Sequence, residues 1–169
     1  MPTAAARVPV GVGRWSRWHA VRVKIRPAER LDAAALVPLY EQWSHPQPAG
    51  VIADVLDVWA GADRAEILVA AFDGELAGMA AVSAGPHLAH PGSSARLVGL
   101  VVDDRFRRRG VATALLDAAE RLAREWGCDR MELTSSRARD AAHLFYPARG
   151  YEETSGHHAR YVKALVGSP

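Results

Sequence analysis

Arginine side chains crowd into one short stretch of the chain, "VVDDRFRRRGVATALLDAAERLA". A turn that leads into a helix leaves backbone N–H groups without intrahelical acceptors, and the helix dipole adds partial positive charge there. Such a turn binds phosphate oxygens. The glycine that follows the arginines lets the backbone approach an anion closely. The residues concerned are Arg105, Arg107, Arg108, Arg109 and Gly110.

The neighbouring residues favour a small phosphorylated ligand over nucleic acid. Ala112 keeps the next inward position small, and Arg107 can add a charge-assisted hydrogen bond to the anion. Nucleic-acid readers usually spread basic and aromatic residues across a face, whereas here the basic residues concentrate at one turn. The net charge of the whole chain is only +2, which gives weak bulk attraction to DNA.

Elements of alternating type surround this turn and must position it. The patterns of apolar residues predict the order β, α, α, β, β, β, α, β, α, β, β, with no internal repeat. The expected elements are a strand at 21–27, helices at 28–44 and 51–61, a hairpin at 65–85 with an Asp-Gly turn, a strand at 95–104, a helix at 111–126, a strand at 130–136, a helix at 139–150 and one or two strands within 151–165.

Apolar residues at helical spacing predict the buried face of each long helix. The first helix is expected to bury Leu31, Ala35, Leu36, Leu39 and Trp43, and the second Val51, Val55, Val58 and Trp59. The third is expected to bury Ala112, Leu115, Leu116, Ala119, Leu122, Ala123 and Trp126. Glu120 and Arg124 on its other face have the spacing of an ion pair.

Composition indicates one ordinary globular domain. The chain has 169 residues, of which 49% are apolar and 24% charged, and no apolar run is long enough to span a membrane. The single cysteine, Cys128, excludes an internal disulfide and a multi-cysteine metal site, which fits a reducing cytoplasm. We expect Cys128 to be a small buried residue and not a covalent acyl carrier.

Residues 1–22 show no sustained periodicity, so we expect a flexible N-terminal extension followed by one domain over 23–169. Trp15 and Trp18 among arginines leave open a docking segment instead. A natural start of translation near Val23 is a third interpretation.

Two motifs give the chain a resemblance to the GCN5-related N-acetyltransferases, the GNAT family. The family pattern Arg/Gln-x-x-Gly-x-Gly/Ala reads Arg107-Arg108-Arg109-Gly110-Val111-Ala112 here, after a central strand and before a long helix. A second pattern, Ala-x-x-x-Tyr-x-x-x-Gly-aromatic, reads "AHLFYPARGY" from Ala142 to Tyr151. Gly110 and Tyr146 lie 36 positions apart, and the resemblance covers about Val23 to Leu165.

The resemblance implies a fold. Members have an α/β (α+β) architecture with a central mixed, mostly antiparallel sheet of six to seven strands and about four helices on its two faces.

The resemblance also implies a reaction, in which an acetyl group moves from acetyl-CoA to a primary amine, without a metal, by direct attack in a ternary complex. The pantetheine arm would pair with Leu100, Val101 and Val102, because a splayed strand leaves backbone groups for its amides. The pyrophosphate would bind at residues 108–113, that is Arg108, Arg109, Gly110, Val111, Ala112 and Thr113. Tyr146 would protonate the leaving thiolate as general acid.

Two residues depart from the family pattern. Pro147 follows Tyr146 directly, and proline removes an N–H and disfavours helical geometry at the residue before it. Arg139 stands four residues after Ser135, where many members have asparagine. Arg139 is a candidate for contact with the CoA phosphates, and solvent exposure is its plainer interpretation.

The general base is left open by the sequence. A primary amine with a pKa near ~10.4 is only about one part in 2500 unprotonated at pH 7, so a base or a water relay has to take its proton. The central strand carries no Glu at the place where many members have one. The candidates are His87 and His90 before that strand, and Glu41 and His45 at the end of the first helix.

Several other functions remain open at this stage. They are a catalytically weak acyl-CoA-binding module, a protein lysine or N-terminal acetyltransferase, and a binder of nucleic acid or anionic surfaces that uses Arg105 to Arg109. The expected partner is a small-molecule amine, with neither nucleic acid nor membrane, and the resemblance leaves room for a homodimer.

Overall fold

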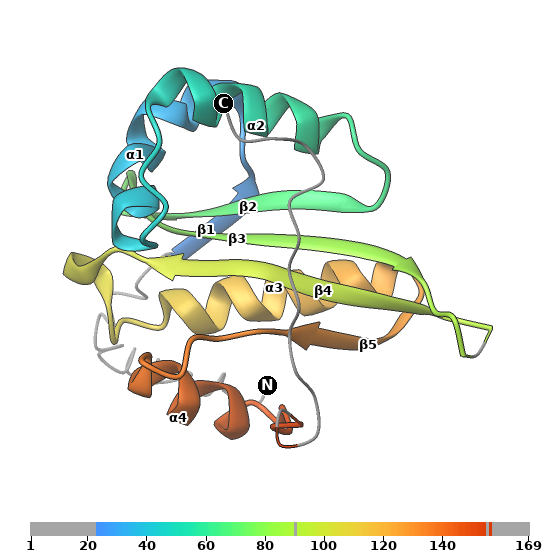
Figure 1. Cartoon of the computed structure of the whole chain (residues 1–169). Helices are drawn as coiled ribbons and strands as arrows, with labels where there is room; N and C mark the ends of the chain where they lie inside the picture. Colours follow the sequence, from blue (N-terminus) through green and yellow to red (C-terminus); the bar gives the residue numbers. More distant parts are fainter. Residues whose placement is uncertain (1–22, 90, 155, 157–169) are drawn as a thin grey trace, which may run out of the picture.

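A single sheet with the strand order β1-β2-β3-β4-β5 crosses the molecule (Figure 1). The computed structural model describes residues 23–89, 91–154 and 156. The strands are β1 (Val23–Pro27), β2 (Ala65–Phe72), β3 (Glu75–Pro86), β4 (Ser93–Val102) and β5 (Cys128–Leu133). β1 to β4 pair antiparallel in succession, and β5 pairs parallel with β4. A parallel pair needs a long crossover, and α3 supplies it.

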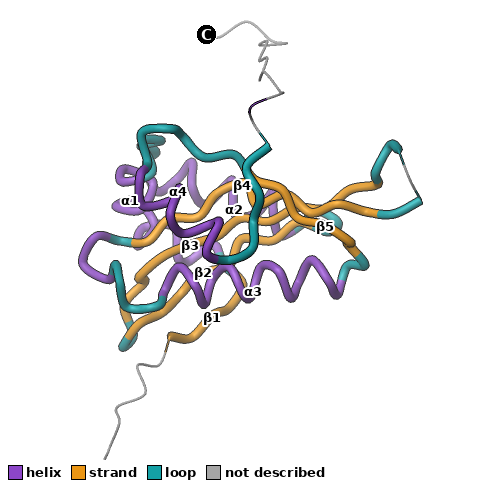
Figure 2. The backbone as a smooth tube through the Cα atoms, turned by 90° about the horizontal axis from the view of Figure 1, so that it is seen from below, coloured by secondary structure: helices purple, strands orange, loops and turns teal. Residues whose placement is uncertain are grey.

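Helices cover both faces of the sheet. They are α1 (Ala33–Gln42), α2 (Ala49–Ala60), α3 (Val111–Glu125) and α4 (Asp140–Ala148), with 3-10 turns η1 (Arg30–Asp32) and η2 (Asp104–Phe106). The view from below in Figure 2 has α3 and α4 in front of the strands and α2 behind them. Up to residue 150, the order and type of these elements agree with the expectation from the sequence.

Side-chain alternation along β2 explains why both faces are covered. Ile67 and Val69 pack with α1 and α2, whereas Leu68, Ala70 and Phe72 pack with α3. Successive side chains of a strand point to opposite faces, so a strand that is buried on both sides is apolar at nearly every position.

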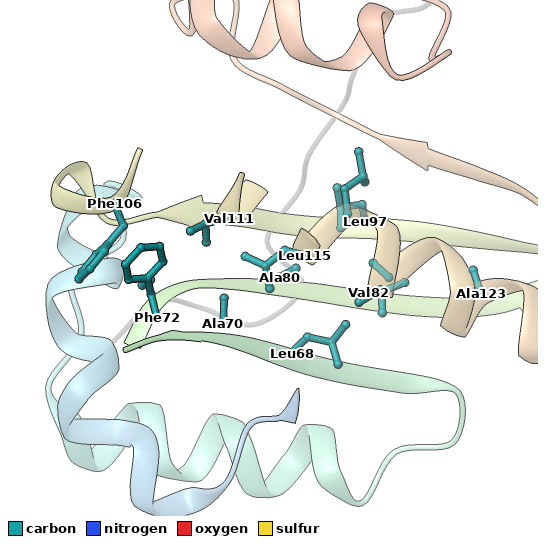
Figure 3. Packing of buried hydrophobic residues seen from close by; sticks show 14 of the residues in the cluster. Leu68, Ala70, Phe72, Ala80, Val82, Leu97, Phe106, Val111, Leu115 and Ala123 are labelled. Atoms are coloured by element: carbon teal, nitrogen blue, oxygen red, sulfur yellow. The ribbon is translucent and has the colours of Figure 1, made fainter. Parts of the chain in front are cut away.

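The core on the α3 side is the larger of the two and lies directly under the arginine turn. Figure 3 shows the rings of Phe72 and Phe106 together at one end, next to Val111 and Leu115 from the first turns of α3. The two phenylalanine centroids are 5.3 Å apart. Apolar packing therefore fixes the start of α3 in the absence of any ligand.

The predicted mixed, mostly antiparallel sheet with four helices is confirmed, but the described part of the chain has five strands and not six or seven. The sequence also predicted one or two strands within 151–165. Residues 151–154 form no strand, and most of the rest of this range lies outside the described residues. The expected extension at 1–22 also lies outside them.

The predicted buried faces of the first two helices were partly wrong. Leu31 is 90% exposed because η1 precedes α1, with Asp32 held by Arg26. On α2 the buried residues are Ile52, Ala53 and Leu56, whereas Val51 and Val58 are exposed. An almost wholly apolar helix offers several faces, and Asp54 and Asp57, which pair with Arg30, fix the outward one.

The third helix agrees with its predicted face and its predicted ion pair. It buries Leu115, Leu116, Ala119 and Ala123, and Arg124 binds Glu120 at 2.9 Å. Among the residues that the structure describes, no helix has the length and apolar character needed to cross a membrane.

Candidate active site

The edge of β4 changes its pairing halfway along the strand. The β3–β4 register passes from Ala81↔Gly99 to Val82↔Leu97, which leaves Val98 as the extra residue of a bulge. Pairing with β5 ends at Leu97↔Leu133, and β4 continues to Val102 past the end of β5 (Figure 1). Within the described residues, this last part of β4 has no strand partner on its β5 side. Its backbone groups there are available to a ligand.

The three residues predicted to pair with pantetheine lie on this free part of β4. Leu100 and Val102 turn their side chains toward the α3 core, and Val101 is buried against α1 and α2. Their side chains therefore pack into the two cores, and what they offer a ligand is backbone.

The arginine turn is built from left-handed backbone. Arg108 has φ 61° and Gly110 has φ 81°, whereas Arg109 between them is not left-handed. Alternation of hand points successive N–H groups into one concavity, which binds anions. A Cβ built on Gly110 meets nothing within 4 Å, so a side chain there would project into open space beside the turn. A left-handed non-glycine residue is strained, and such strain clusters at functional sites.

The first turn of α3 completes this concavity. The Ala114 N–H bonds the Gly110 carbonyl at 3.0 Å, so the N–H groups of Val111, Ala112 and Thr113 have no intrahelical acceptor. Gly110 is the N-cap, and no side chain caps the helix. Val111 is buried, which holds these N–H groups at a fixed place.

The arginines of the turn have different partners. Arg105 binds the buried carboxylate of Asp103 and also Glu75. Arg107 pairs with Asp104, and the Arg109 guanidinium lies 5.5 Å from the centre of the Phe72 ring. Arg108 is exposed, and among the described residues it has no hydrogen-bond or ion-pair partner. Two of the four thus brace the turn, and Arg107 and Arg108 are the ones most able to turn toward a ligand.

Tyr146 is held by the way α4 ends. The Tyr151 N–H bonds the Tyr146 carbonyl at 3.1 Å, the Gly150 N–H bonds the Pro147 carbonyl at 3.0 Å, and Gly150 has φ 87°. This is a Schellman motif, in which an apolar contact joins the flanking residues. Here that contact is between the rings of Tyr146 and Tyr151, at 5.8 Å. The spacing Tyr-x-x-x-Gly-Tyr therefore encodes the placement of Tyr146.

Pro147 does not break α4. It lies inside the helix, near its C-terminal end, and Tyr146 keeps helical geometry. The distortion expected from the sequence is absent because only one helical N–H, near the end of a short helix, is lost.

Burial raises the pKa of the Tyr146 hydroxyl above the ordinary value near ~10, and the positive charge of Arg139 partly opposes this rise. Tyr146 packs against the same core as Leu100 and Val102. The hydroxyl is therefore protonated at neutral pH, as a proton donor must be. Ala142, one turn earlier on α4, is half-buried.

Arg139 connects α4 to α1. It is the N-cap of α4, and its Nη2 donates to the carbonyl of Trp43 at 3.2 Å. Trp43 is the C-cap of α1, so the guanidinium satisfies a carbonyl at the end of that helix. Its side chain is exposed, as the plainer interpretation of the sequence expected, but its contact is with Trp43 and not with the arginine turn.

Trp43 in turn packs on the bulge of β4. A Cβ built on Gly99 would lie 2.8 Å from Cζ2 of Trp43, closer than real side chains come. The indole therefore occupies the place of the side chain that Gly99 lacks. This contact was missed by the sequence interpretation, and an isolated glycine in a strand is its only local signal.

The four residues that the sequence offered as general base do not all lie together in the structure. His45 lies directly after α1, with its ring 4.6 Å from that of Trp43. Glu41 lines a shallow hollow with Val37 and Pro46. His87 lies at the β3–β4 hairpin, where its N–H bonds the Gly92 carbonyl. At about 3.3 Å per strand residue this is roughly 20 Å from Gly99, so the structure does not bring His87 to the free edge of β4. His90 lies outside the described residues.

Two further sequence expectations concern Cys128 and metal. Cys128 is half-buried in β5, where Arg64 Nη2 lies 3.5 Å from its sulfur. The described residues contain no group of three or more His, Cys, Asp or Glu side chains placed to hold a metal ion.

Comparisons with known proteins agree with this geometry. The profile of the acetyltransferase (GNAT) family matches residues 29–151. An aminoglycoside N(6')-acetyltransferase type 1 of Klebsiella aerogenes is 33% identical over 141 residues, which are 78% of this chain and 90% of that protein. An aminoalkylphosphonate N-acetyltransferase of Salmonella typhimurium is 34% identical over 93 residues, which are 55% of this chain and 58% of that protein.

Solved structures share the fold. The aminoglycoside N-acetyltransferase AAC(6')-Iy in complex with CoA has a TM-score of 0.75 at 23% identity, covering 92% of this chain and 99% of that one. A transcriptional regulator from Bacillus halodurans has a TM-score of 0.76 at 23% identity, covering 85% and 100%. With the family match over more than half of the chain, the protein belongs to the GNAT acetyltransferase family.

Proposed function

We propose that the protein transfers an acetyl group from acetyl-CoA to a primary amine of a small molecule, by direct attack within a ternary complex. The observation that carries the proposal is the continuity of two features of the backbone. The free edge of β4 over 98–102 leads through η2 into the concavity formed by Arg108 to Gly110 and the uncapped start of α3. An amide-containing arm fits the first, and a pyrophosphate fits the second.

The roles of the site residues follow from this placement. The backbone of Leu100 to Val102 would bind the pantetheine amides. The N–H groups of residues 108–113 would bind the pyrophosphate, with Arg107 and Arg108 adding charge, while Arg109 braces the turn against Phe72. Binding in this manner would place the thioester beside the bulge of β4, within reach of Tyr146 under this proposal.

Tyr146 would supply the proton that the departing thiolate needs. Attack of the amine on the thioester carbonyl forms the C–N bond, and the C–S bond breaks as the tetrahedral intermediate collapses. The raised pKa of Tyr146 keeps its proton available through neutral pH.

Small-molecule acceptors are supported by the relatives. The names of the two curated relatives specify an aminoglycoside and an aminoalkylphosphonate as acceptors. Both are small molecules with amino groups, whereas a protein substrate is named by neither. The chain covers 90% of the first of these enzymes, so most of its acetyltransferase domain has a counterpart here.

A screen of amines with detection of released thiol tests the proposal. Aminoglycosides, aminoalkylphosphonates and lysine-containing peptides would be compared at equal acetyl-CoA concentration. We expect thiol release that depends on a small amine. Binding of acetyl-CoA without turnover on any amine would favour a non-catalytic binding module, and turnover confined to peptides would favour a protein acetyltransferase.

A further inference from the structure

We propose that His45 accepts the proton of the acceptor amine, with Ser44, Trp43 and Arg139 as the residues that position it. The inference rests on the proposed function and supplies the base that the sequence left open. It is drawn from the end of α1, where three features converge on one imidazole.

The first feature is a strained helix end. α1 closes with a Schellman pair, in which the Ser44 N–H bonds the Glu41 carbonyl at 2.9 Å and the His45 N–H bonds the Tyr40 carbonyl at 3.0 Å. The left-handed position of this motif usually holds glycine, but here it holds Ser44 with φ 66°. Strain of this kind persists where the surrounding structure fixes it, and it clusters at functional sites. Its effect is to set the direction of His45.

The second feature fixes the tautomer of the imidazole. Nδ1 of His45 lies 2.7 Å from the carbonyl oxygen of Ser44. A carbonyl oxygen can only accept a hydrogen bond, so Nδ1 carries the proton in the neutral ring. Nε2 therefore holds the lone pair, and the opposite edge of the ring is the one that can accept a proton.

The third feature ties the imidazole to the free edge of β4. The ring of His45 lies against Trp43, and Trp43 lies against Gly99 in the bulge where pairing with β5 has ended. Arg139 holds the Trp43 carbonyl from the N-cap of α4, the helix that carries Tyr146. Arg139 thus links the end of α1, which leads to His45, to the helix that carries Tyr146.

The proton balance of the step is complete. The ammonium of the acceptor gives one proton to Nε2 of His45, which passes it to solvent. The neutral amine attacks the thioester carbon, the C–N bond forms and the C–S bond breaks. The sulfur takes a proton from the Tyr146 hydroxyl, and the proton that leaves the new amide nitrogen restores the tyrosine.

Charged groups at the end of α1, which lies close to His45 in the chain, come from three elements. Glu41 lies one turn earlier on α1, Arg139 comes from α4, and Asp104 follows β4 with its N–H bound to Gln42 Oε1 at 3.0 Å. A pH effect of His45 has to be separated from the titration of these groups. The test therefore compares the replacement of His45 with the same replacement at a second histidine, His87.

The test measures kcat/KM of the full chain from pH 6 to pH 9.5 with an aminoglycoside as acceptor, in His45→Gln and in the matched control His87→Gln. Because general base catalysis contributes about 10²–10⁴-fold, His45→Gln should lose at least ~10-fold at pH 7. The loss should shrink toward pH 9.5, because free amine becomes abundant as the pH approaches ~10. His87→Gln should follow the wild type throughout.

Separate readouts keep the two proposals distinguishable. Both variants should melt near the wild-type temperature and bind acetyl-CoA with wild-type affinity in calorimetry. A His45→Gln deficit that stays constant over the whole pH range, or no deficit, would overturn the role of His45 while leaving the acetyltransferase proposal intact. Absence of wild-type turnover on every amine of the screen described above would overturn both.

Discussion

At the scale of single residues, the proposed chemistry depends on one oxygen atom, the hydroxyl of Tyr146. The ring of Tyr146 packs against the α3 core, and the Schellman turn at Gly150 holds it beside Tyr151. Tyr151 has a different partner, because its hydroxyl donates to Glu120 at 3.1 Å. The two tyrosines therefore offer a pair of matched substitutions with opposite expected effects.

Removal of the Tyr146 hydroxyl should affect turnover and not binding. Tyr146→Phe keeps the ring, so acetyl-CoA affinity should change by less than about 3-fold, because an interaction made only in the transition state leaves ground-state binding unchanged. The rate of thiol release should fall at least ~10-fold, because general acid catalysis contributes about 10²–10⁴-fold. Tyr151→Phe should instead lower the free energy of unfolding by about 1 kcal/mol and leave the rate nearly unchanged. Undiminished turnover in Tyr146→Phe would mean that another donor protonates the thiolate.

Asp103 carries a residue-scale prediction about pH. Its carboxylate is buried and accepts hydrogen bonds from the Arg105 side chain and backbone N–H, which lowers the pKa of Asp103. A lowered folded-state pKa gives stability that is present above the unfolded value near ~3.9 and is lost as the pH falls through the folded value. Asp103→Asn should therefore cost about 1–3 kcal/mol at pH 7, and this difference from the wild type should shrink below about pH 4.

Urea unfolding at pH 7, 5, 4 and 3 checks this, with the exposed Asp63 as the control position for an Asp→Asn change. A difference between wild type and Asp103→Asn that is the same at pH 7 and pH 3 would show that the carboxylate charge has no part in it.

At the scale of elements, the site depends on how the end of α1 meets the bulge of β4. Trp43 and Gly99 are distant in sequence, and the indole takes the space of the missing side chain. Arg139 joins α4 to the same corner. Three elements thus meet where β4 leaves β5.

Gly99→Ala should disturb this corner. The added Cβ would lie 2.8 Å from the indole, so Trp43 has to move. We expect a loss of about 1–3 kcal/mol in the free energy of unfolding, as for other overpacked sites, together with lower turnover. Gly85→Ala on β3 is the control, because a Cβ there meets nothing within 4 Å. Equal unfolding midpoints for the two variants in urea would contradict the packing of Trp43 on Gly99.

The elements that sequence predicts well here are those with local causes. α3 has one apolar stripe and begins after Gly110, and both were evident from the spacing of its residues. The buried face of α2 was predicted only in part, because its sequence is apolar nearly all round. The partner of Asp57, which helps to fix the outward face, is Arg30, 27 positions away. The left-handed Ser44 and the Trp43–Gly99 contact could not be predicted, because tertiary packing and not local preference sets them.

At the scale of the whole molecule, the proposed anion site is one small region of a nearly neutral protein. The net charge is +2, and Arg105 and Arg107 are paired with acidic neighbours. Long-range attraction to polyanions is therefore weak, and affinity has to come from the shape of the backbone at the start of α3. Nucleic-acid binding through the arginine stretch would instead fall steeply with salt and ignore acetyl-CoA.

Calorimetric titration of acetyl-CoA into wild type, Gly110→Asp and Gly74→Asp tests this most directly. Like Gly110, Gly74 has a positive φ, of 91°, and a Cβ built on it would meet nothing within 4 Å. Gly74 lies instead in the β2–β3 turn. Both substitutions cost similar backbone strain, and only the one at Gly110 places a carboxylate in front of the α3 N–H groups. We expect wild type and Gly74→Asp to bind with equal affinity and Gly110→Asp to show no measurable binding. A folded Gly110→Asp protein that binds acetyl-CoA as tightly as Gly74→Asp would contradict the assignment of this turn as the pyrophosphate site.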